Sequence, residues 1–158
     1  MSNLHFQPLL TQSPLVANSQ YLPREYNLII GPAGSIPPSM HRISIDTLTL
    51  SFGPDEHVLI GLDAYTNAEQ WERRKLVIPS VDHEAALICT DAFDEHGIGP
   101  GGVGPLKYIY SDEQNRLLIR LGDRKATKRV RCLSCVICGL DENGKLVEIW
   151  VDVKKTPS

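Results

Sequence analysis

The chain has 158 residues, of which 42% are hydrophobic and 22% charged, and its formal net charge is −3. A chain of this length is typical of one domain and can bury roughly 70% of its unfolded surface, which suffices for a stable core. The composition is that of an ordinary globular protein, and no run approaches the roughly 18 apolar residues of a membrane-spanning helix. We therefore expect a single domain over residues 1–158 with no membrane contact.

The N-terminal segment, residues 1–20, shows no sustained periodicity and contains Pro8 and Pro14. We expect a loose arm or a strand added at the edge of a sheet. No Lys or Arg precedes Arg24, which argues against a secretory signal, so we expect a cytoplasmic protein.

An internal repeat is the main feature of the sequence. Tyr21 to Ile30 aligns with Tyr110 to Ile119, and Ile43 to Tyr65 aligns with Val130 to Asp152. Self-similarity of this kind indicates two degenerate copies of one unit. The copies and their connection are expected at about residues 21–65 for the first repeat, residues 66–106 for a helix and linker, and residues 107–153 for the second repeat.

Both copies also share a change of phase in their apolar alternation. Successive side chains of a strand point to opposite faces, so one extra residue changes which positions along the strand face the core. We interpret the change of phase as a β-bulge, which inserts such a residue and lets the apolar side chains face the core again. The alternating residues are Ile43, Ile45, Leu48 and Leu50 in the first copy and Val130, Cys132, Cys135 and Ile137 in the second.

The second copy predicts four strands joined by turns. Two polar clusters, residues 112–115 and 141–144, separate apolar runs, and Asn143-Gly144 is a strong hairpin signal because both residues tolerate positive φ. We interpret the copy as an antiparallel β-meander. The predicted strands cover residues 107–111, 116–122, 129–137 and 145–153.

The linker between the repeats predicts one short helix. Thr66 and Glu69 have the spacing of a capping box, so a helix is expected over residues 67–76, and Pro79 would stop it. The expected fold class is therefore α+β, mostly antiparallel, with two degenerate β-meander repeats and one short helix between them.

The second repeat resembles a small uncharacterised bacterial domain. The resemblance rests on Tyr110-Ser-Asp, on Leu117-Leu-Ile-Arg-Leu121, and on the hairpin that closes with Gly144-Lys-Leu-Val-Glu-Ile149. It covers residues 108–152 and, loosely, residues 21–65, and it implies a β-rich fold with no known activity. The whole arrangement also resembles bacterial immunity-type proteins of about this size.

Two groups of residues could hold a metal ion. The C-x-x-C-x-x-C spacing resembles one knuckle of a zinc ribbon, but it lies in a predicted strand, where Cys behaves as a small buried hydrophobe. Asp91, Asp94 and His96 could together bind a hard cation, or they could lie in a loop that is exposed to solvent. The candidate ligands are Asp91, Asp94, His96, Cys132, Cys135 and Cys138.

A Gly-rich segment, residues 97–102, fits the dinucleotide fingerprint by its letters alone. A phosphate site there would need the start of a helix, whereas Pro105 and a strand follow and acidic residues precede. We therefore expect a flexible loop and no cofactor.

Positive charge is concentrated in the second half of the chain. Residues 1–100 hold 5 basic and 12 acidic residues, whereas residues 101–158 hold 11 and 7. Six basic residues lie around one predicted hairpin and could either form a solvated turn or bind an acidic protein partner, while the negative net charge argues against nucleic acid. These candidate partner-binding residues are Arg120, Arg124, Lys125, Lys128, Arg129 and Arg131.

The sequence contains no convincing set of nucleophile, base and orienting group. We therefore expect a non-enzymatic bacterial binding protein, such as an immunity or antitoxin-like inhibitor that occupies an acidic surface of a toxin. The alternative is a metal-binding module or metal-dependent enzyme that uses the acidic loop at residues 91–96 or the cysteine cluster.

Overall fold

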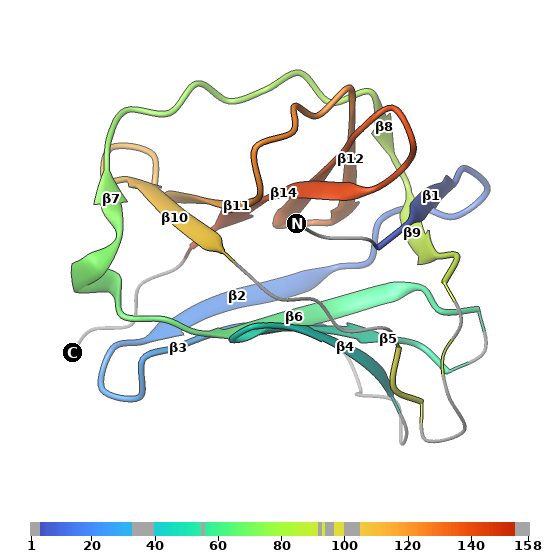
Figure 1. The fold of residues 1–158 in the computed structure, drawn as a ribbon, viewed down its shortest axis with the longest axis horizontal. Helices are drawn as coiled ribbons and strands as arrows, with labels where there is room; N and C mark the ends of the chain where they lie inside the picture. Colours follow the sequence, from blue (N-terminus) through green and yellow to red (C-terminus); the bar gives the residue numbers. More distant parts are fainter. Residues whose placement is uncertain are drawn as a thin grey trace.

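The computed structural model describes residues 4–32, 40–54, 56–91, 93, 97–99 and 105–153. Two β-sheets pack face to face, as the two layers in Figure 1 show. The first sheet has the order β2-β3-β6-β5-β4 and the second the order β7-β10-β11-β14-β13-β12-β8. The strands of the first sheet are β2 (Ala17–Leu22), β3 (Asn27–Pro32), β4 (His41–Ile45), β5 (Leu48–Phe52) and β6 (Leu59–Tyr65). Those of the second are β7 (Glu72–Arg73), β8 (His83–Glu84), β10 (Leu106–Ser111), β11 (Arg116–Leu121), β12 (Lys128–Leu133), β13 (Val136–Leu140) and β14 (Leu146–Asp152).

A small third sheet lies at one end of the sandwich. It pairs β1 (Phe6–Leu9) with β9 (Ala86–Cys89). The Phe6 amide donates to the Gly144 carbonyl, and Val58 forms an isolated bridge with Ile88, so this pair is tied to both halves of the chain. In the N-terminal segment, residues 6–9 and 17–20 are thus strand.

The expected α+β class is wrong, because the described residues are 57% strand and only 2% helical. The predicted helix at residues 67–76 is a single 3-10 turn, η1 (Ala68–Gln70), after which the chain extends into β7. Asn67, not Thr66, caps the turn by accepting a hydrogen bond from the Glu69 amide. The Thr66 hydroxyl instead accepts the indole N–H of Trp71 at 2.8 Å, so it is not available as a cap.

The predicted meander is also wrong. In the second half β11 pairs with β14 and not with β12, which gives the order β10-β11-β14-β13-β12. The first half has the same order, β2-β3-β6-β5-β4. A strand that returns to lie beside an earlier hairpin is the arrangement of a Greek key.

The shared change of phase is a hairpin turn in both halves, not a β-bulge as we predicted. Asp46 and Thr47 separate β4 from β5, and Ser134 and Cys135 separate β12 from β13, so the predicted strand at residues 129–137 is two strands. A two-residue turn reverses the chain and changes the phase of the alternation, just as an inserted residue does. In the second half, the register of the pairing between β12 and β13 also shifts between Arg131 and Leu133.

A register shift common to both halves lies one hairpin further along the chain. It falls between Ser51 and Phe52 in the first half and between Gly139 and Leu140 in the second. The extra residue is on the opposite strand in each case, at Ile60 of β6 and Val147 of β14. The hairpin predicted at residues 141–144 is confirmed, and Gly144 adopts the positive φ, 81°, that this turn requires.

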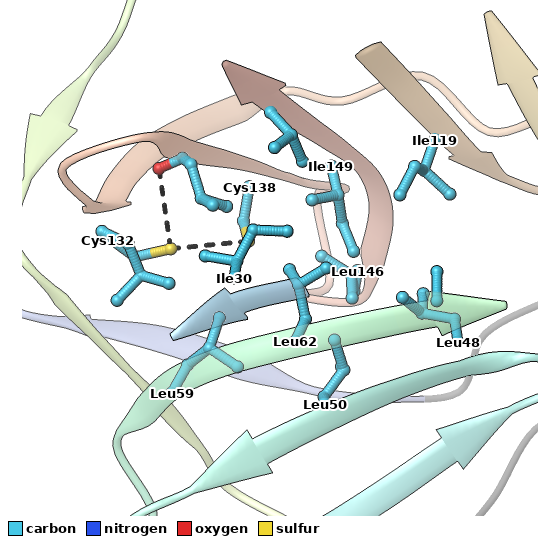
Figure 2. Close-up of a cluster of buried hydrophobic side chains, with 14 of the residues drawn as sticks. Ile30, Leu48, Leu50, Leu59, Leu62, Ile119, Cys132, Cys138, Leu146 and Ile149 are labelled. Carbon is cyan, nitrogen blue, oxygen red and sulfur yellow. Dashed lines mark hydrogen bonds between the residues drawn. The ribbon is translucent and has the colours of Figure 1, made fainter. Parts of the chain in front are cut away.

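The main core lies between the two sheets. Figure 2 shows side chains from both layers meeting there, including Ile30, Leu59 and Leu62 from the first sheet and Cys138 and Ile149 from the second. These residues are at most 3% exposed. Trp71 is also buried in this core, while Trp150 belongs to a smaller cluster on the outer face of the second sheet.

Candidate functional site

The outer face of the seven-stranded sheet is partly covered by the chain itself. After β7 the chain crosses the outer face of the seven-stranded sheet to β8 at the opposite edge, as the green segment at the top of Figure 1 shows. We call residues 74–82 the strap and the sheet face beneath it the strapped face. The Arg74 amide donates to the Tyr110 carbonyl of β10, and the Asp82 amide donates to the Arg129 carbonyl of β12. Each end of the strap is therefore hydrogen-bonded to the strand next to an edge of the sheet.

Apolar side chains hold the middle of the strap. Leu76 is buried and Val81 partly buried against Trp150 and its neighbours Ile109, Leu118 and Ile137. These residues lie on the face opposite the main core, because side chains alternate along each strand. The strap therefore covers an apolar row that would otherwise face solvent.

A pocket of about 650 Å³ lies beside the strap, above the start of β10. Its volume is within the range of small-ligand sites, roughly 300–1,000 Å³. Ile109 and Leu118 supply an apolar floor, and the rim carries basic side chains. The basic lining residues are Arg74, Lys75, Lys107 and Arg120, and Asp123 is the acidic one.

The cations of the rim are only partly compensated. Glu72 lies 2.7 Å from Arg74 and 3.5 Å from Lys107, so one carboxylate serves two cations. Lys75 forms no ion pair with any residue that the structure describes. The rim therefore presents net positive charge around an apolar floor.

Two apolar residues of the strap are exposed next to this pocket. Val77 is 83% exposed and Ile78 is 45% exposed. Val77 also lines the pocket, so the apolar surface continues from the pocket floor onto the outside of the strap.

Next to the pocket, Glu148 is held between two arginines. It is 3% exposed, and its carboxylate lies 3.0 Å from Arg120 and 3.0 Å from Arg129. The indole N–H of Trp150 donates to the same carboxylate. The four residues Arg120, Glu148, Gly139 and Arg129 form one row across the strands β11, β14, β13 and β12. Three donors thus satisfy the buried carboxylate, as a charge removed from water requires.

The predicted partner-binding residues do not form one free patch. Arg120 and Arg129 bind Glu148, and Arg131 lies 3.2 Å from Glu84. Lys125 and Lys128 are exposed and form no ion pair within the described part of the chain.

Arg124 is also paired, because its guanidinium lies 3.1 Å from Asp141. Burial by itself would raise the pKa of Asp141, but hydrogen bonds from the Lys145 and Asn143 amides and from Arg124 outweigh burial and lower the pKa. The carboxylate of Asp141 therefore stays charged and fixes both the hairpin after β13 and the position of Arg124.

The cysteines proposed as metal ligands are placed differently from one another. The thiols of Cys132 and Cys138 lie 3.6 Å apart between the sheets, joined by the dashed line in Figure 2. The contact with Cys132 and burial together raise the pKa of Cys138 well above its usual value. Cys135 is partly buried in the turn between β12 and β13.

The acidic loop is described only in part. Asp91 accepts hydrogen bonds from the His5 amide and is in contact with the His5 ring at 3.2 Å. Asp94 and His96 lie outside the described residues. Among the residues that the structure describes, no three His, Cys, Asp or Glu side chains come together as a metal site.

Sequence reasoning missed the strap and its pocket. The capping-box pattern predicts a helix through residue 76, and nothing in the local pattern indicates that this segment crosses a sheet whose central strands come about 30 residues later. The available signal was Val77-Ile78-Pro79, an extended apolar run that ends at a Pro in a segment without alternation.

The chain matches no protein-family model, and no curated protein is significantly similar to it. In the described part of the chain, no helix is long and apolar enough to span a bilayer.

Proposed function

We propose that this protein is a non-enzymatic binding protein whose strapped face captures an acidic segment of a partner protein. The proposal includes the cytoplasmic location and the immunity or antitoxin-like class that the sequence suggested, in which the partner is a toxin with an acidic surface. The basic rim of the pocket, its apolar floor and the exposed apolar residues of the strap support it.

The observation that carries the proposal is the exposure of Val77 and Ile78 beside the basic pocket. Exposed apolar residues rimmed by polar ones are typical of protein interfaces. A small molecule would fill the pocket and leave the outside of the strap bare. A protein segment can place one apolar side chain in the pocket and lie along Val77 at the same time.

Charge supports an acidic partner in particular. Arg74, Lys75 and Lys107 surround the pocket, and Glu72 and Asp123 offset them in part. Among the other described acidic residues, Asp112 and Glu113 lie on the far side of Arg74 and Lys75, outside this pocket. Complementary charge of this kind speeds association and excludes partners of like charge more than it increases affinity. We therefore expect the captured segment to combine an apolar anchor with neighbouring Asp or Glu.

A selection from a random peptide library displayed on phage tests the proposal. The wild-type protein should enrich peptides with an apolar residue beside acidic ones. Both Val77→Ser/Ile78→Ser and Lys75→Glu/Lys107→Glu should lose that enrichment, because they remove the apolar ridge and the charge respectively.

The matched control is Lys125→Glu/Lys128→Glu, which makes the same charge change away from the pocket. This control should enrich the same peptides as the wild type. All the substituted residues are exposed, so thermal melting should remain close to that of the wild type. No enrichment by the wild type, or the same enrichment by all variants, would contradict the proposal.

A further inference from the structure

A second pocket, of about 510 Å³, lies at the corner where β6 leads through η1 into β7. Its walls include the aromatic residues Tyr65, Trp71 and Tyr108, and its polar lining includes Asn67 and Gln70. Leu106 and Lys107 separate it from the pocket beside the strap and line both. It differs from that pocket in chemistry, because its walls are aromatic and its polar groups include uncharged amides.

The turn that forms this pocket is rigidly supported. The Tyr21 hydroxyl donates to the Thr66 carbonyl at 2.9 Å and accepts from the Ala68 amide at 2.9 Å. The indole N–H of Trp71 is fixed by Thr66, and its ring packs 5.1 Å from Tyr21 and 5.3 Å from Tyr110 between ring centres. A wall held in this way loses little freedom when a ligand binds, which favours affinity.

One aromatic ring of the pocket is open to solvent. Tyr65 is 63% exposed, and the ring of Tyr26 lies nearly perpendicular to it with ring centres 6.1 Å apart. A perpendicular ring helps to fix the orientation of Tyr65 and can cover at most one of its two faces. The face of an aromatic ring carries partial negative charge and attracts weakly positive C–H groups.

The polar groups around this ring are suited to hydroxyls. Asn67 uses its side-chain oxygen to cap η1, which leaves its amide N–H groups to donate outward. The exposed side chain of Gln70 makes no hydrogen bond within the described part of the chain. The charged residues in the lining of this pocket are Glu72 and Lys107, which lie 3.5 Å apart and offset each other, so neither an anion nor a cation meets a strong field here.

From this geometry we infer that the pocket binds a neutral saccharide. The C–H face of the sugar ring stacks on Tyr65, and hydroxyls at its rim pair with Asn67 and Gln70. A sugar ring combines a flat apolar face with a rim of donors and acceptors, which matches an exposed aromatic ring bordered by amides. The site is separate from the capture of an acidic segment and does not rest on it.

Saturation-transfer NMR on the full chain tests the inference, with maltose, cellobiose, lactose and chitobiose as probes at millimolar concentration. At least one of them should receive magnetisation at its ring C–H protons. Tyr65→Ala should raise the Kd of that sugar roughly tenfold or more, which is about 1.4 kcal/mol. Tyr65→Phe should bind within about threefold of the wild type, because it keeps the ring. Gln70→Ala should weaken binding by removing one hydroxyl partner.

Leu10→Ala is the matched control, since Leu10 is also exposed and follows β1 at the opposite end of the molecule in Figure 1. It should bind the sugar as the wild type does. The inference fails if none of the four sugars binds, or if Tyr65→Ala and the wild type bind equally. It also fails if choline or glucuronate, tested in the same way, binds more tightly than every neutral sugar.

Discussion

A Cβ atom placed on Gly139 would lie 2.2 Å from Cγ of Glu148 on the neighbouring strand. The side chain of Glu148 crosses the space above Gly139 to reach Arg129, while its other oxygen binds Arg120. A larger residue at position 139 would displace the carboxylate from both arginines. The absence of a side chain at this position is therefore what allows a charged row to be buried beside the strap.

Gly139→Ala should consequently destabilise the protein by about 2 kcal/mol or more, because overpacking is combined with loss of ion pairing. Urea unfolding measures the change. Gly31→Ala is the control, since a Cβ there would meet no atom within 4 Å, and it should be nearly neutral. If the unfolding free energy of Gly139→Ala lies within about 0.5 kcal/mol of the wild-type value, the side chain of Glu148 does not occupy the space above Gly139 as described.

Glu148→Gln tests the same row through its charge. Removing one partner of a buried ion pair leaves the others uncompensated, and we expect a loss of about 3 kcal/mol of unfolding free energy. Glu84→Gln removes the partner of Arg131 at a site where Glu84 is mostly exposed, and it should cost at most about 1 kcal/mol. Equal losses of unfolding free energy for Glu148→Gln and Glu84→Gln would contradict the prediction that the buried ion pairs of Glu148 contribute more than the exposed pair of Glu84.

The histidines at the end of the first sheet should make stability depend on pH. The His57 ring lies 5.0 Å from that of His41 and 4.2 Å from that of Phe93 between centres. Burial, and then repulsion from His41, lower the pKa of His57 below 6.5. The unfolded chain therefore takes up a proton at a higher pH than the native protein. The contribution of His57 to stability is complete above pH 6.5 and is lost as the pH falls through the lowered pKa.

Urea unfolding of the wild type and of His57→Asn, compared above and below pH 6.5, checks this prediction. Asn is chosen because His57 has a φ of 54°, which Asn tolerates. The wild type should lose more stability on acidification than the variant does, since other titrating groups affect both equally. The same loss in both proteins would mean that His57 does not contribute.

Thiol reactivity should separate the cysteines. Burial raises the pKa of Cys89 to about 11, and Cys138 is fully buried beside Cys132. Because the thiolate is the reactive form, these three should react with a disulfide reagent only when the chain opens, whereas the partly buried Cys135 should react first. Mass spectrometry of the native protein after brief labelling identifies the site. Rapid labelling of Cys132 or Cys138 would contradict their place in the core.

How far the sequence could predict this structure depends on how local each feature is. The apolar runs that form β11 and β14 and the turn at Gly144 are local, so they could be recognised. Pairing of β11 with β14 instead of β12 depends on contacts between distant segments, and the pattern of either strand permits both arrangements. The helix prediction failed because Thr66 bonds Trp71 instead of capping.

The candidate site was harder to predict for the same reason. Glu148 lies in the pattern Leu-Val-Glu-Ile-Trp, where a charged residue is typical of a solvent-facing position. It is buried because Arg120 and Arg129 approach it from two other strands and the strap passes nearby. Arg120 and Arg129 were recognised as basic, but their partner could not be inferred from spacing along the chain.

The most direct test of the strapped face as a binding surface is the association rate of an acidic, apolar peptide selected on the wild type. Stopped-flow anisotropy should be recorded at low salt and again at high salt, where the Debye length falls from ~30 Å to ~3 Å. At low salt Lys75→Glu/Lys107→Glu should associate at least roughly tenfold more slowly than the wild type, and the difference should shrink at high salt. Lys125→Glu/Lys128→Glu should match the wild type more closely. Equal rates for the wild type and Lys75→Glu/Lys107→Glu at low salt would contradict the account.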